Sequence, residues 1–312
     1  MPGLGKPGYR VRDIVRYNMK RFLLILIISL SVTSYAGVSQ LNMPYQLLEK
    51  SSDGMLGVAA IDTGSNEKLN YNGNKRFPFC STFKFMLAAA ILKKSQVNHG
   101  LLEKKLHYTK QDLIGWSPIT RKNLSGGMTV KQLCRAAITQ SDNAAANLLM
   151  RLLGGPQAVT RFARSIGDKH FNLVRWETAL NTAIPGDVRD TTTPLSMTNS
   201  LKAIVFGGVL TTKNKQLIKS WLLENETGAK RIRAGAPRGW VIGDKTGTGD
   251  YGSTNDIGII WPPKCNPIVI SLYFTRHKKH AAIDEKTLVE ATRLILTNFS
   301  KSDHCLKKHL VW

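Results

Sequence analysis

The pattern of apolar and polar residues places strands towards both ends of the chain and helices between them. Residues 56–62 and 68–71, separated by the turn TGSNE, predict two strands. Three more are predicted near the C-terminus, in the segments GWVIGDKTGT, STNDIGIIW and PIVISLYFT. Because the strands are segregated from most of the helices, the pattern favours an α+β fold with an antiparallel sheet.

The central part of the chain has helical periodicity. The segment FKFMLAAAILKK is apolar almost all round, which is typical of a helix buried in the core of a large domain. In MTVKQLCRAAIT, Thr129 is a candidate N-cap, and in SDNAAANLLMRLLGG the helix is stopped by Gly154 and Gly155. Further helical patterns cover residues 43–52, 196–223 and 284–299.

One long segment lacks any clean period. Residues 171–194 therefore predict a loop, and an ordered loop of this length is usually functional. We expect residues 37–75 and 224–312 to form a sheet domain, and residues 76–223 to form an inserted helical domain. A cleft between two such domains is the natural place for chemistry.

Residues 1–36 predict a secretory signal peptide. Lys20 and Arg21 precede an apolar run at 22–32, and cleavage is expected after Ala36. The run is about eleven residues, whereas a membrane span needs roughly 20. We therefore expect a periplasmic or extracellular protein with no membrane anchor once the signal is removed.

Such signals begin with a methionine followed by basic residues, and Met19 occupies that position. Residues 1–18 are then either an upstream extension or an unusually long basic region of the signal. The sequence leaves both alternatives open.

Composition fits a globular protein with one large domain or two moderate ones. The 312 residues are 42% hydrophobic and 21% charged, with a formal net charge of +23. The Lys and Arg residues are scattered and no nucleic-acid motif is present, so no nucleic-acid partner is expected. A basic, solvated surface would attract anionic substrates or an anionic cell envelope.

The chain has four cysteines, Cys80, Cys134, Cys265 and Cys305. Their spacings match no zinc pattern, and no metal is expected. An exported chain could pair them in three ways, of which a Cys265–Cys305 bridge is one. We expect Cys80 to be a buried small hydrophobic residue.

Ser81 and Lys84 are three residues apart, so on a helix they share a face. A lysine beside a serine hydroxyl can accept its proton if burial or a second cation, such as Lys245, lowers the lysine pKa. The alternative is a surface lysine, but Phe83 and Phe85 make that part of the helix apolar. The Ser-x-x-Lys spacing alone is weak, since it occurs by chance.

Two further triplets strengthen the Ser81–Lys84 motif as evidence for a catalytic serine. They are Ser-Asp-Asn at 141–143, which opens a helix, and Lys-Thr-Gly at 245–247, on a strand. With them the chain resembles the serine penicillin-recognising enzymes. A fourth stretch, RWETALNTAIPGDVRDTTTP, resembles the omega loop of class A β-lactamases. The four motifs occur in order and span nearly the whole mature chain.

The resemblance implies a five-stranded antiparallel sheet flanked by helices, with an inserted all-helical domain that includes an omega loop at 175–190. It also implies a monomeric enzyme without a cofactor. The expected activity is hydrolysis of the β-lactam amide bond of penicillins and some cephalosporins, which gives antibiotic resistance.

The same resemblance implies four catalytic residues. Ser81 would be the nucleophile, Lys84 its activator, and Ser141 a proton relay to the leaving lactam nitrogen. Glu177 would activate the water that deacylates the enzyme. Whether the lysine or the glutamate is the base for acylation is disputed for the class. For 141–143 on its own, a simple helix cap is the alternative reading.

The expected substrate-binding residues would orient the water, hold the substrate amide and carboxylate, and complete the oxyanion hole with backbone N–H groups. The set comprises Trp116, Asn143, Asn181, Arg231, Lys245, Thr246, Gly247 and Thr248. Two of these have alternatives: Arg231 as a surface arginine and Trp116 as a core residue.

Several positions refine the resemblance. Arg175 and Asp190 match the pair that closes the omega loop at its neck. Thr178 stands where many members have proline.

Arg231 with Thr248 resembles class A carbapenemases, which favours weak carbapenem hydrolysis beside the penicillins and early cephalosporins. The disulfide of those carbapenemases is absent, because Gly249 stands opposite Cys80. Another common family disulfide is also absent, since Ala88 occupies the position of the partner of Cys134.

Two other functions remain as alternatives. A D-alanyl-D-alanine peptidase of the penicillin-binding family shares the three short motifs but lacks the Glu177 loop. A β-lactam sensor would also lack that glutamate and would normally be membrane-tethered. Neither a G-x-S-x-G nor an H-E-x-x-H motif occurs, so a histidine-triad esterase and a metallo-hydrolase have little support.

Overall fold

The computed structural model describes residue 3 and residues 42–312. The predicted signal peptide therefore lies outside the described residues. Within the described part, no helix has the length and apolar character needed to cross a membrane. Residues 47–312 make up one compact unit. The division into a sheet domain and a helical domain stays a prediction.

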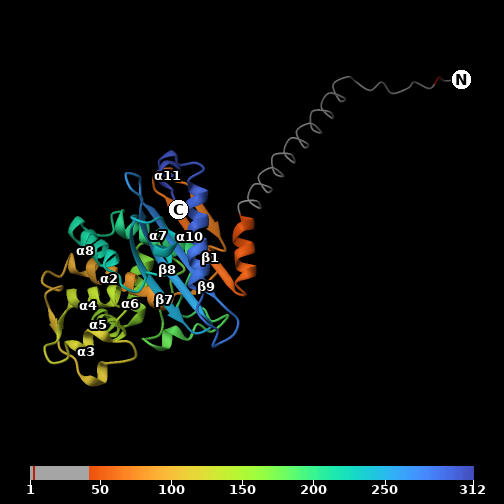
Figure 1. The fold of residues 1–312 in the computed structure, drawn as a ribbon. Coiled ribbons are helices and arrows are strands. Elements are labelled where there is room, and N and C mark those ends of the chain that lie inside the picture. The colour runs from red at the N-terminus through yellow and green to blue at the C-terminus, as the bar shows by residue number, and fades with distance from the viewer. Residues whose placement is uncertain (1–2, 4–41) are drawn as a thin grey trace. The chain divides into compact units, whose positions relative to one another are not determined.

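A five-stranded antiparallel sheet runs through the molecule in the order β2-β1-β9-β8-β7 (Figure 1). Two short ladders, β3–β6 and β4–β5, lie outside it. The strands are β1 Met55–Asp62, β2 Lys68–Tyr71, β3 Phe77–Pro78, β4 Lys105–Leu106, β5 Met128–Thr129, β6 Thr191–Thr192, β7 Val241–Gly249, β8 Ser253–Trp261 and β9 Ile268–Thr275. The predicted α+β class and the five-stranded antiparallel sheet are confirmed.

Helices flank the sheet and fill the middle of the chain. The α-helices are α2 Phe83–Ser95, α3 Pro118–Lys122, α4 Val130–Thr139, α5 Asn143–Leu153, α6 Pro156–Ser165, α7 Pro194–Val205, α8 Thr212–Leu223, α9 Ile232–Gly235, α10 Glu285–Phe299 and α11 His304–His309. Short 3-10 helices are η1 Cys80–Thr82, η2 Lys110–Asp112 and η3 Ala179–Thr182. Residues 42–51 are also helical, close to the predicted 43–52.

The central strands are buried along almost their whole length because helices cover the sheet. Both α7 and α10 pack on β1 and β9, and α8 packs on β7. Every residue of β1 after Met55 is buried, and so is every residue of β8 before Trp261. Strands covered in this way read as continuous apolar runs rather than as a clean alternation.

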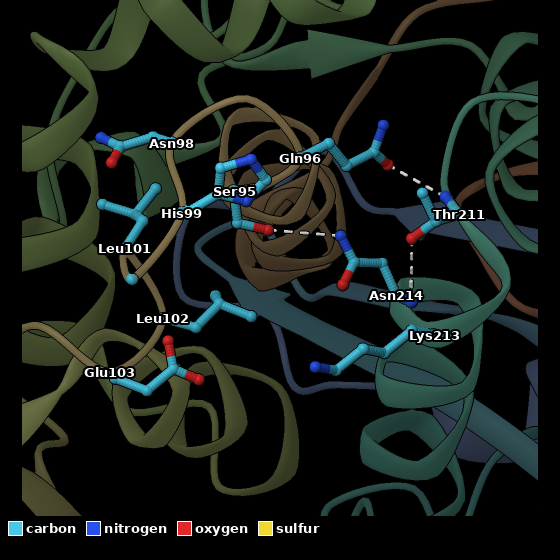
Figure 2. Close-up of a pocket in the computed structure, with 11 residues that line it drawn as sticks. Ser95, Gln96, Asn98, His99, Leu101, Leu102, Glu103, Thr211, Lys213 and Asn214 are labelled. Carbon is cyan, nitrogen blue, oxygen red and sulfur yellow. Dashed lines mark hydrogen bonds between the residues drawn. The ribbon is translucent and has the colours of Figure 1, made fainter.

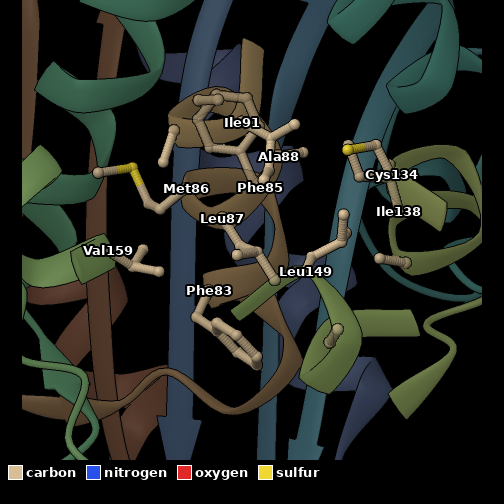
Figure 3. Close-up of a cluster of buried hydrophobic side chains, with 14 of the residues drawn as sticks. Phe83, Phe85, Met86, Leu87, Ala88, Ile91, Cys134, Ile138, Leu149 and Val159 are labelled. Carbon is tan, nitrogen blue, oxygen red and sulfur yellow. The ribbon is translucent and has the colours of Figure 1, made fainter. Parts of the chain in front are cut away.

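Helix α2 is the centre of the helical part. Ten consecutive residues, 83–92, are buried, as the all-round apolar pattern predicts. Figure 3 shows α2 side chains facing Cys134 of α4, Leu149 of α5 and Val159 of α6. A helix enclosed on all sides has little freedom to shift, so residues at its start are held rigidly.

Local signals end and begin the helices where the sequence indicates. The Thr129 side chain accepts a hydrogen bond from the Gln132 N–H and forms a capping box at the start of α4. Gly154 adopts the left-handed conformation, with φ 94°, that ends α5. The predicted helical segment 196–223 is divided into α7 and α8.

The cysteines resolve one open alternative. Cys265 and Cys305 form a disulfide that ties the β8–β9 turn to α11, while Cys80 and Cys134 are free and buried. His309 lies beside the two bridged sulfurs. Because both sulfurs are in the disulfide, neither is a thiolate available to bind a metal.

Replacing both Cys265 and Cys305 with serine is expected to lower the free energy of unfolding by about 2–4 kcal/mol, because the bridge closes a long loop in the unfolded chain. The two cysteines are 40 residues apart. Urea denaturation followed by tryptophan fluorescence measures the effect. Reductant should lower the wild-type midpoint to that of the variant and leave the variant unchanged. Equal midpoints for the oxidised wild type and the variant would contradict a stabilising role.

Candidate functional site

Ser81 lies in η1, immediately before α2, and is buried. Lys84 is in the first turn of α2 and is fully buried. Its Nζ atom donates to Ser81 Oγ over 3.0 Å. The spacing of three residues thus brings the two side chains together, and the surface-lysine alternative is wrong.

The Lys84 ammonium has further oxygen partners from segments that are distant in sequence. It donates to the Ser141 carbonyl oxygen over 2.8 Å and to Asn143 Oδ1 over 2.6 Å. It also forms an ion pair of 2.9 Å with Glu177 Oε1, in which both side chains are fully buried. Together these contacts offset the cost of burying the ammonium.

The turn before α5 combines a cap with the site residues. Asp142 accepts hydrogen bonds from the N–H groups of Ala145, Ile119 and Thr120, each over 2.9 Å, so it caps α5 and ties α3 to it. Ser141 has φ 55°, and its Oγ lies 3.1 Å from Lys245 Nζ and 3.4 Å from Lys84 Nζ. The triplet 141–143 therefore both caps a helix and places the Ser141 side chain beside the two lysines.

Glu177 is held from two sides. Asn181 Nδ2 donates to Glu177 Oε2 over 2.6 Å, while Oε1 faces Lys84. The peptide groups of Glu177 are also fixed, because Asn147 Oδ1 accepts from its N–H and Asn147 Nδ2 donates to its carbonyl, both over 3.0 Å. The peptide bond between Glu177 and Thr178 is cis.

Asn147 is a residue that the sequence motifs did not identify. It lies four positions after Asn143 on α5, so the two share a helix face. That spacing is the signal that could have revealed it.

The loop that carries Glu177 is closed by an ion pair between Arg175 and Asp190. Arg175 Nε lies 2.5 Å from Asp190 Oδ2, and the Asp190 carboxylate also accepts from the N–H groups of Val174 and Arg175. The Asp190 carbonyl accepts from the Phe79 N–H, next to η1. The neck of the loop is therefore joined to the segment that carries Ser81.

Lys245 projects from β7 on the other side of Ser141. It is fully buried, and burial, followed by the nearby Lys84 cation, lowers the pKa of Lys245 to about 7. Its Nζ also donates to the Thr246 carbonyl over 2.8 Å. The Thr246 hydroxyl is hydrogen-bonded to that of Thr227, which sequence reasoning did not identify.

Arg231 reaches the same strand from the segment before α9. It is 4% exposed, so the surface-arginine alternative is wrong. One guanidinium nitrogen donates to Thr248 Oγ1 over 2.8 Å and another donates to the carbonyl oxygens of Gly247 and Asn255. Arg231 Nε lies 3.5 Å from the Glu285 carboxylate, a partner that the motifs did not predict.

Glycine is required where β7 passes η1. A Cβ atom on Gly247 would lie 2.6 Å from the Phe79 carbonyl oxygen and 3.2 Å from the Ser81 nitrogen. A side chain there would collide with the backbone, so only glycine lets the strand lie against the Ser81 segment.

Trp116 is 62% exposed, which excludes core packing. Its indole N–H donates to the Gln140 carbonyl over 2.8 Å, and its own carbonyl accepts from the Asn143 N–H. Trp116 is therefore a surface aromatic fixed to the turn that carries Ser141.

A separate pocket of about 310 Å³ lies at the far end of α2 (Figure 2). Its lining includes Ser95 and Gln96 of the α2 end and Asn214 of α8, whose amide donates to Ser95 Oγ. None of the site residues predicted from the sequence lines it. The sequence motifs instead converge at the start of α2.

The converged side chains provide the elements of acyl-transfer chemistry. The Ser81 hydroxyl contacts Lys84, and Lys84 contacts the Glu177 carboxylate. The second ammonium, that of Lys245, contacts the Ser141 hydroxyl. A nucleophile, proton acceptors and a cationic clamp for an anionic substrate are thereby within one connected network.

The chain is similar to known β-lactamases in sequence and in fold. The sequence model described as the Beta-lactamase enzyme family matches residues 44–299. The chain is 49% identical to Beta-lactamase OXY-2 of Klebsiella oxytoca, with 80% of this chain and 86% of that protein covered. It is 44% identical to the Carbapenem-hydrolyzing beta-lactamase KPC of Klebsiella oxytoca, with 89% and 96% covered.

A solved structure, that of a beta-lactamase from Desulfarculus baarsii, superimposes with a TM-score of 0.83. It is 46% identical, and the match covers 84% of this chain and 97% of that one.

The Asp190→Asn variant is expected to lose about 3–5 kcal/mol of unfolding free energy, because it removes the close, buried countercharge of Arg175 and leaves only Asp187, at 3.7 Å. The matched control is Asp112→Asn, whose partner Arg151 is mostly exposed, and which should change stability by less than about 1 kcal/mol. Urea denaturation of both variants tests this. Equal losses of unfolding free energy in the two variants would show that the Arg175–Asp190 pair stabilises the protein no more than an exposed surface pair does.

Proposed function

Because the chain belongs to the class A β-lactamases, we propose that it hydrolyses penicillins and some early cephalosporins through an acyl-enzyme on Ser81. The family follows from the matched sequence model and from relatives nearly half identical over most of the chain. The observation that carries the proposed mechanism is the Lys84 ammonium, which contacts both Ser81 Oγ and Glu177 Oε1.

In acylation, Ser81 Oγ attacks the lactam carbonyl carbon and the ring C–N bond breaks. The serine proton passes either to Lys84, after the Lys84 ammonium has given a proton to Glu177 and become a neutral amine, or to Glu177 through a water. The leaving nitrogen takes a proton from Ser141, whose hydroxyl lies between the two lysines, and Ser141 regains a proton from Lys84. Ser81 and Thr248 backbone N–H groups would hold the oxyanion.

In deacylation, Glu177 removes a proton from the water whose oxygen attacks the ester carbonyl carbon. The bond between that carbon and Ser81 Oγ then breaks, and the serine oxygen takes back the proton. Asn181 and Asn147 fix the carboxylate and its backbone, so its orientation is set before substrate arrives. Asn143 would hold the substrate amide as well as Lys84. This step separates the hydrolase from a penicillin-binding protein, which forms the same ester but keeps it.

The substrate carboxylate would bind at β7. Lys245 and Thr246 would contact it, with Arg231 adding positive charge beside Thr248. Gly247 permits the close approach of β7, and Trp116 would flank the opening of the site. We propose that the sheet residues and the inserted helical residues act as two domains around this cleft, in a periplasmic or extracellular monomer released from its signal peptide.

Carbapenems are a second candidate substrate class. The hydrogen bond from Arg231 to Thr248 Oγ1 favours it, and two relatives are named as imipenem-hydrolyzing and carbapenem-hydrolyzing enzymes. Cys80 is free in this chain, with Gly249 beside it. We therefore propose slow carbapenem turnover relative to penicillins.

Hydrolysis of a chromogenic cephalosporin, benzylpenicillin and imipenem by the purified protein, with chelator present, tests the proposal. Rapid penicillin turnover and slower imipenem turnover are expected. A single persistent acyl adduct without turnover would instead indicate a penicillin-binding protein.

The Glu177→Ala variant is expected to accumulate an acyl-enzyme on Ser81, with steady-state kcat reduced by about 10²–10⁴-fold, because the general base for deacylation is lost. Intact-protein mass spectrometry after mixing with benzylpenicillin detects the adduct. Ser81→Ala is the control and should show no adduct. Unimpaired turnover in Glu177→Ala would refute the assigned role.

The pKa of Lys245, lowered to about 7 by burial, predicts a pH dependence. Below this pH the free enzyme carries the ammonium that attracts the substrate carboxylate, and above it the charge is lost. The value of kcat/KM should therefore fall above about pH 7, through a rising KM. In Lys245→Arg the guanidinium stays charged past about pH 12, so the fall should move to higher pH. If kcat/KM falls over the same alkaline pH range in both proteins, the fall is caused by a group other than Lys245.

A further inference from the structure

A pocket of about 230 Å³ is lined in part by the omega loop. One wall is the loop segment 183–187, and the opposite walls are the start of β1, the β3–β6 ladder and the end of β9. None of the proposed catalytic residues lines it.

The interior of this pocket is mainly apolar. Met55, Pro78, Ala183, Ile184 and Pro185 contribute its hydrophobic surface. Ile184 is 45% exposed although it is a large aliphatic residue. An occupant with an apolar body would remove this surface from water, which is favourable.

The charged groups around the pocket are mostly cationic. Arg76 donates only to neutral oxygens, those of His170 and Thr191, and within residues 42–312 no carboxylate is paired with it. The one acidic residue in the lining, Asp187, is already bound by Arg189 and lies 3.7 Å from Arg175. The Arg189 hydrogen bonds lower the Asp187 pKa, so this acid stays ionised and engaged.

Arg276 adds a second guanidinium at the β9 end of the pocket. Its Nη2 pairs with Asp284 over 2.9 Å, but its Nε is buried and has no hydrogen-bond acceptor among the described residues. Its Nη1 donates to the neutral Ala282 carbonyl over 3.2 Å, so Asp284 is the one carboxylate paired with this guanidinium among the described residues. His277 completes the basic side of the lining.

From these features we propose that the pocket binds a small organic anion with an aromatic or alkyl body, such as an aromatic carboxylate. The body lies on the Met55 and Ile184 surface, and the carboxylate lies between Arg76 and Arg276. Carboxylates match the guanidinium fork, which is why arginine is the usual partner.

Occupancy of this pocket stabilises the closed omega loop. The loop wall of the pocket, residues 183–187, follows directly after η3, whose Asn181 holds Glu177. It ends just before Asp190, which pairs with Arg175 to close the loop. A ligand that contacts the loop and the sheet together binds only when the loop is closed, so it shifts the equilibrium towards that state. The site is thus a regulatory anion site at the catalytic loop.

The test uses the full chain labelled with ¹⁵N and titrated with phenylacetate. Saturable shifts are expected at the amides of residues 183, 184, 186, 187 and 275–277, together with slower hydrogen exchange at the amides of residues 183–184 and 186–190. Phenylacetamide, which lacks the charge, and acetate, which lacks the apolar body, should leave these amides unshifted at the same concentrations. Equal shifts with all three compounds, or none with phenylacetate, would overturn the proposal.

Two variants locate the binding. Arg76→Gln should weaken phenylacetate binding at least about tenfold, the loss of one charge-assisted pair. Arg293→Gln, on exposed α10 surface, is the matched control and should bind as wild type. If Arg76→Gln does not fold, Ile184→Asp, at an exposed loop position, serves instead and should abolish binding.

A parallel hydrolysis assay separates this site from the catalytic cleft. Competitive inhibition by phenylacetate that is unaffected by Arg76→Gln would place the probe in the cleft and refute the proposal. Loop shifts in a protein that fails to hydrolyse any β-lactam would refute only the proposed function, since the binding measurement does not depend on turnover.

Discussion

The site is organised around one buried charge, the Lys84 ammonium. A buried ammonium is stable only when oxygen atoms pair with it. Here those oxygens come from Ser81, Ser141, Asn143 and Glu177, on η1, the turn before α5, α5 itself and the omega loop. Each of these segments must be in place for the charge to be satisfied, so the fold and the site are specified together.

The omega loop must itself be held in place so that its oxygen partner of Lys84 is correctly positioned. Glu177 can reach Lys84 only if a loop with little regular structure keeps its shape. The Arg175–Asp190 pair closes the loop, while Asn147 holds its backbone from α5. The pocket proposed to bind an anion is lined by residues 183–187 of the same loop and by none of the catalytic residues, so a ligand there would act on the element that positions Glu177.

Much of the fold followed from local patterns, because period, caps and turn residues are local properties. The all-round apolar α2, the capped α4 and the glycine that ends α5 lie where the sequence predicted them. The short α3 and α6 and the two-residue strands β3 and β6 were not predicted, since their contacts are set by distant partners. The Cys265–Cys305 bridge also depended on which loops meet, and spacing left it open.

The sequence by itself determined the residue types of the chemistry and their order: Ser81 with Lys84, the 141–143 and 245–247 triplets, and a glutamate in a long unpatterned loop. Only the tertiary structure decided the partners that lie outside those motifs. Asn147 beside Glu177 and Glu285 beside Arg231 are examples. The physical reason is that a motif records spacing along one segment, whereas burial of a charge is resolved by atoms that other segments bring to it.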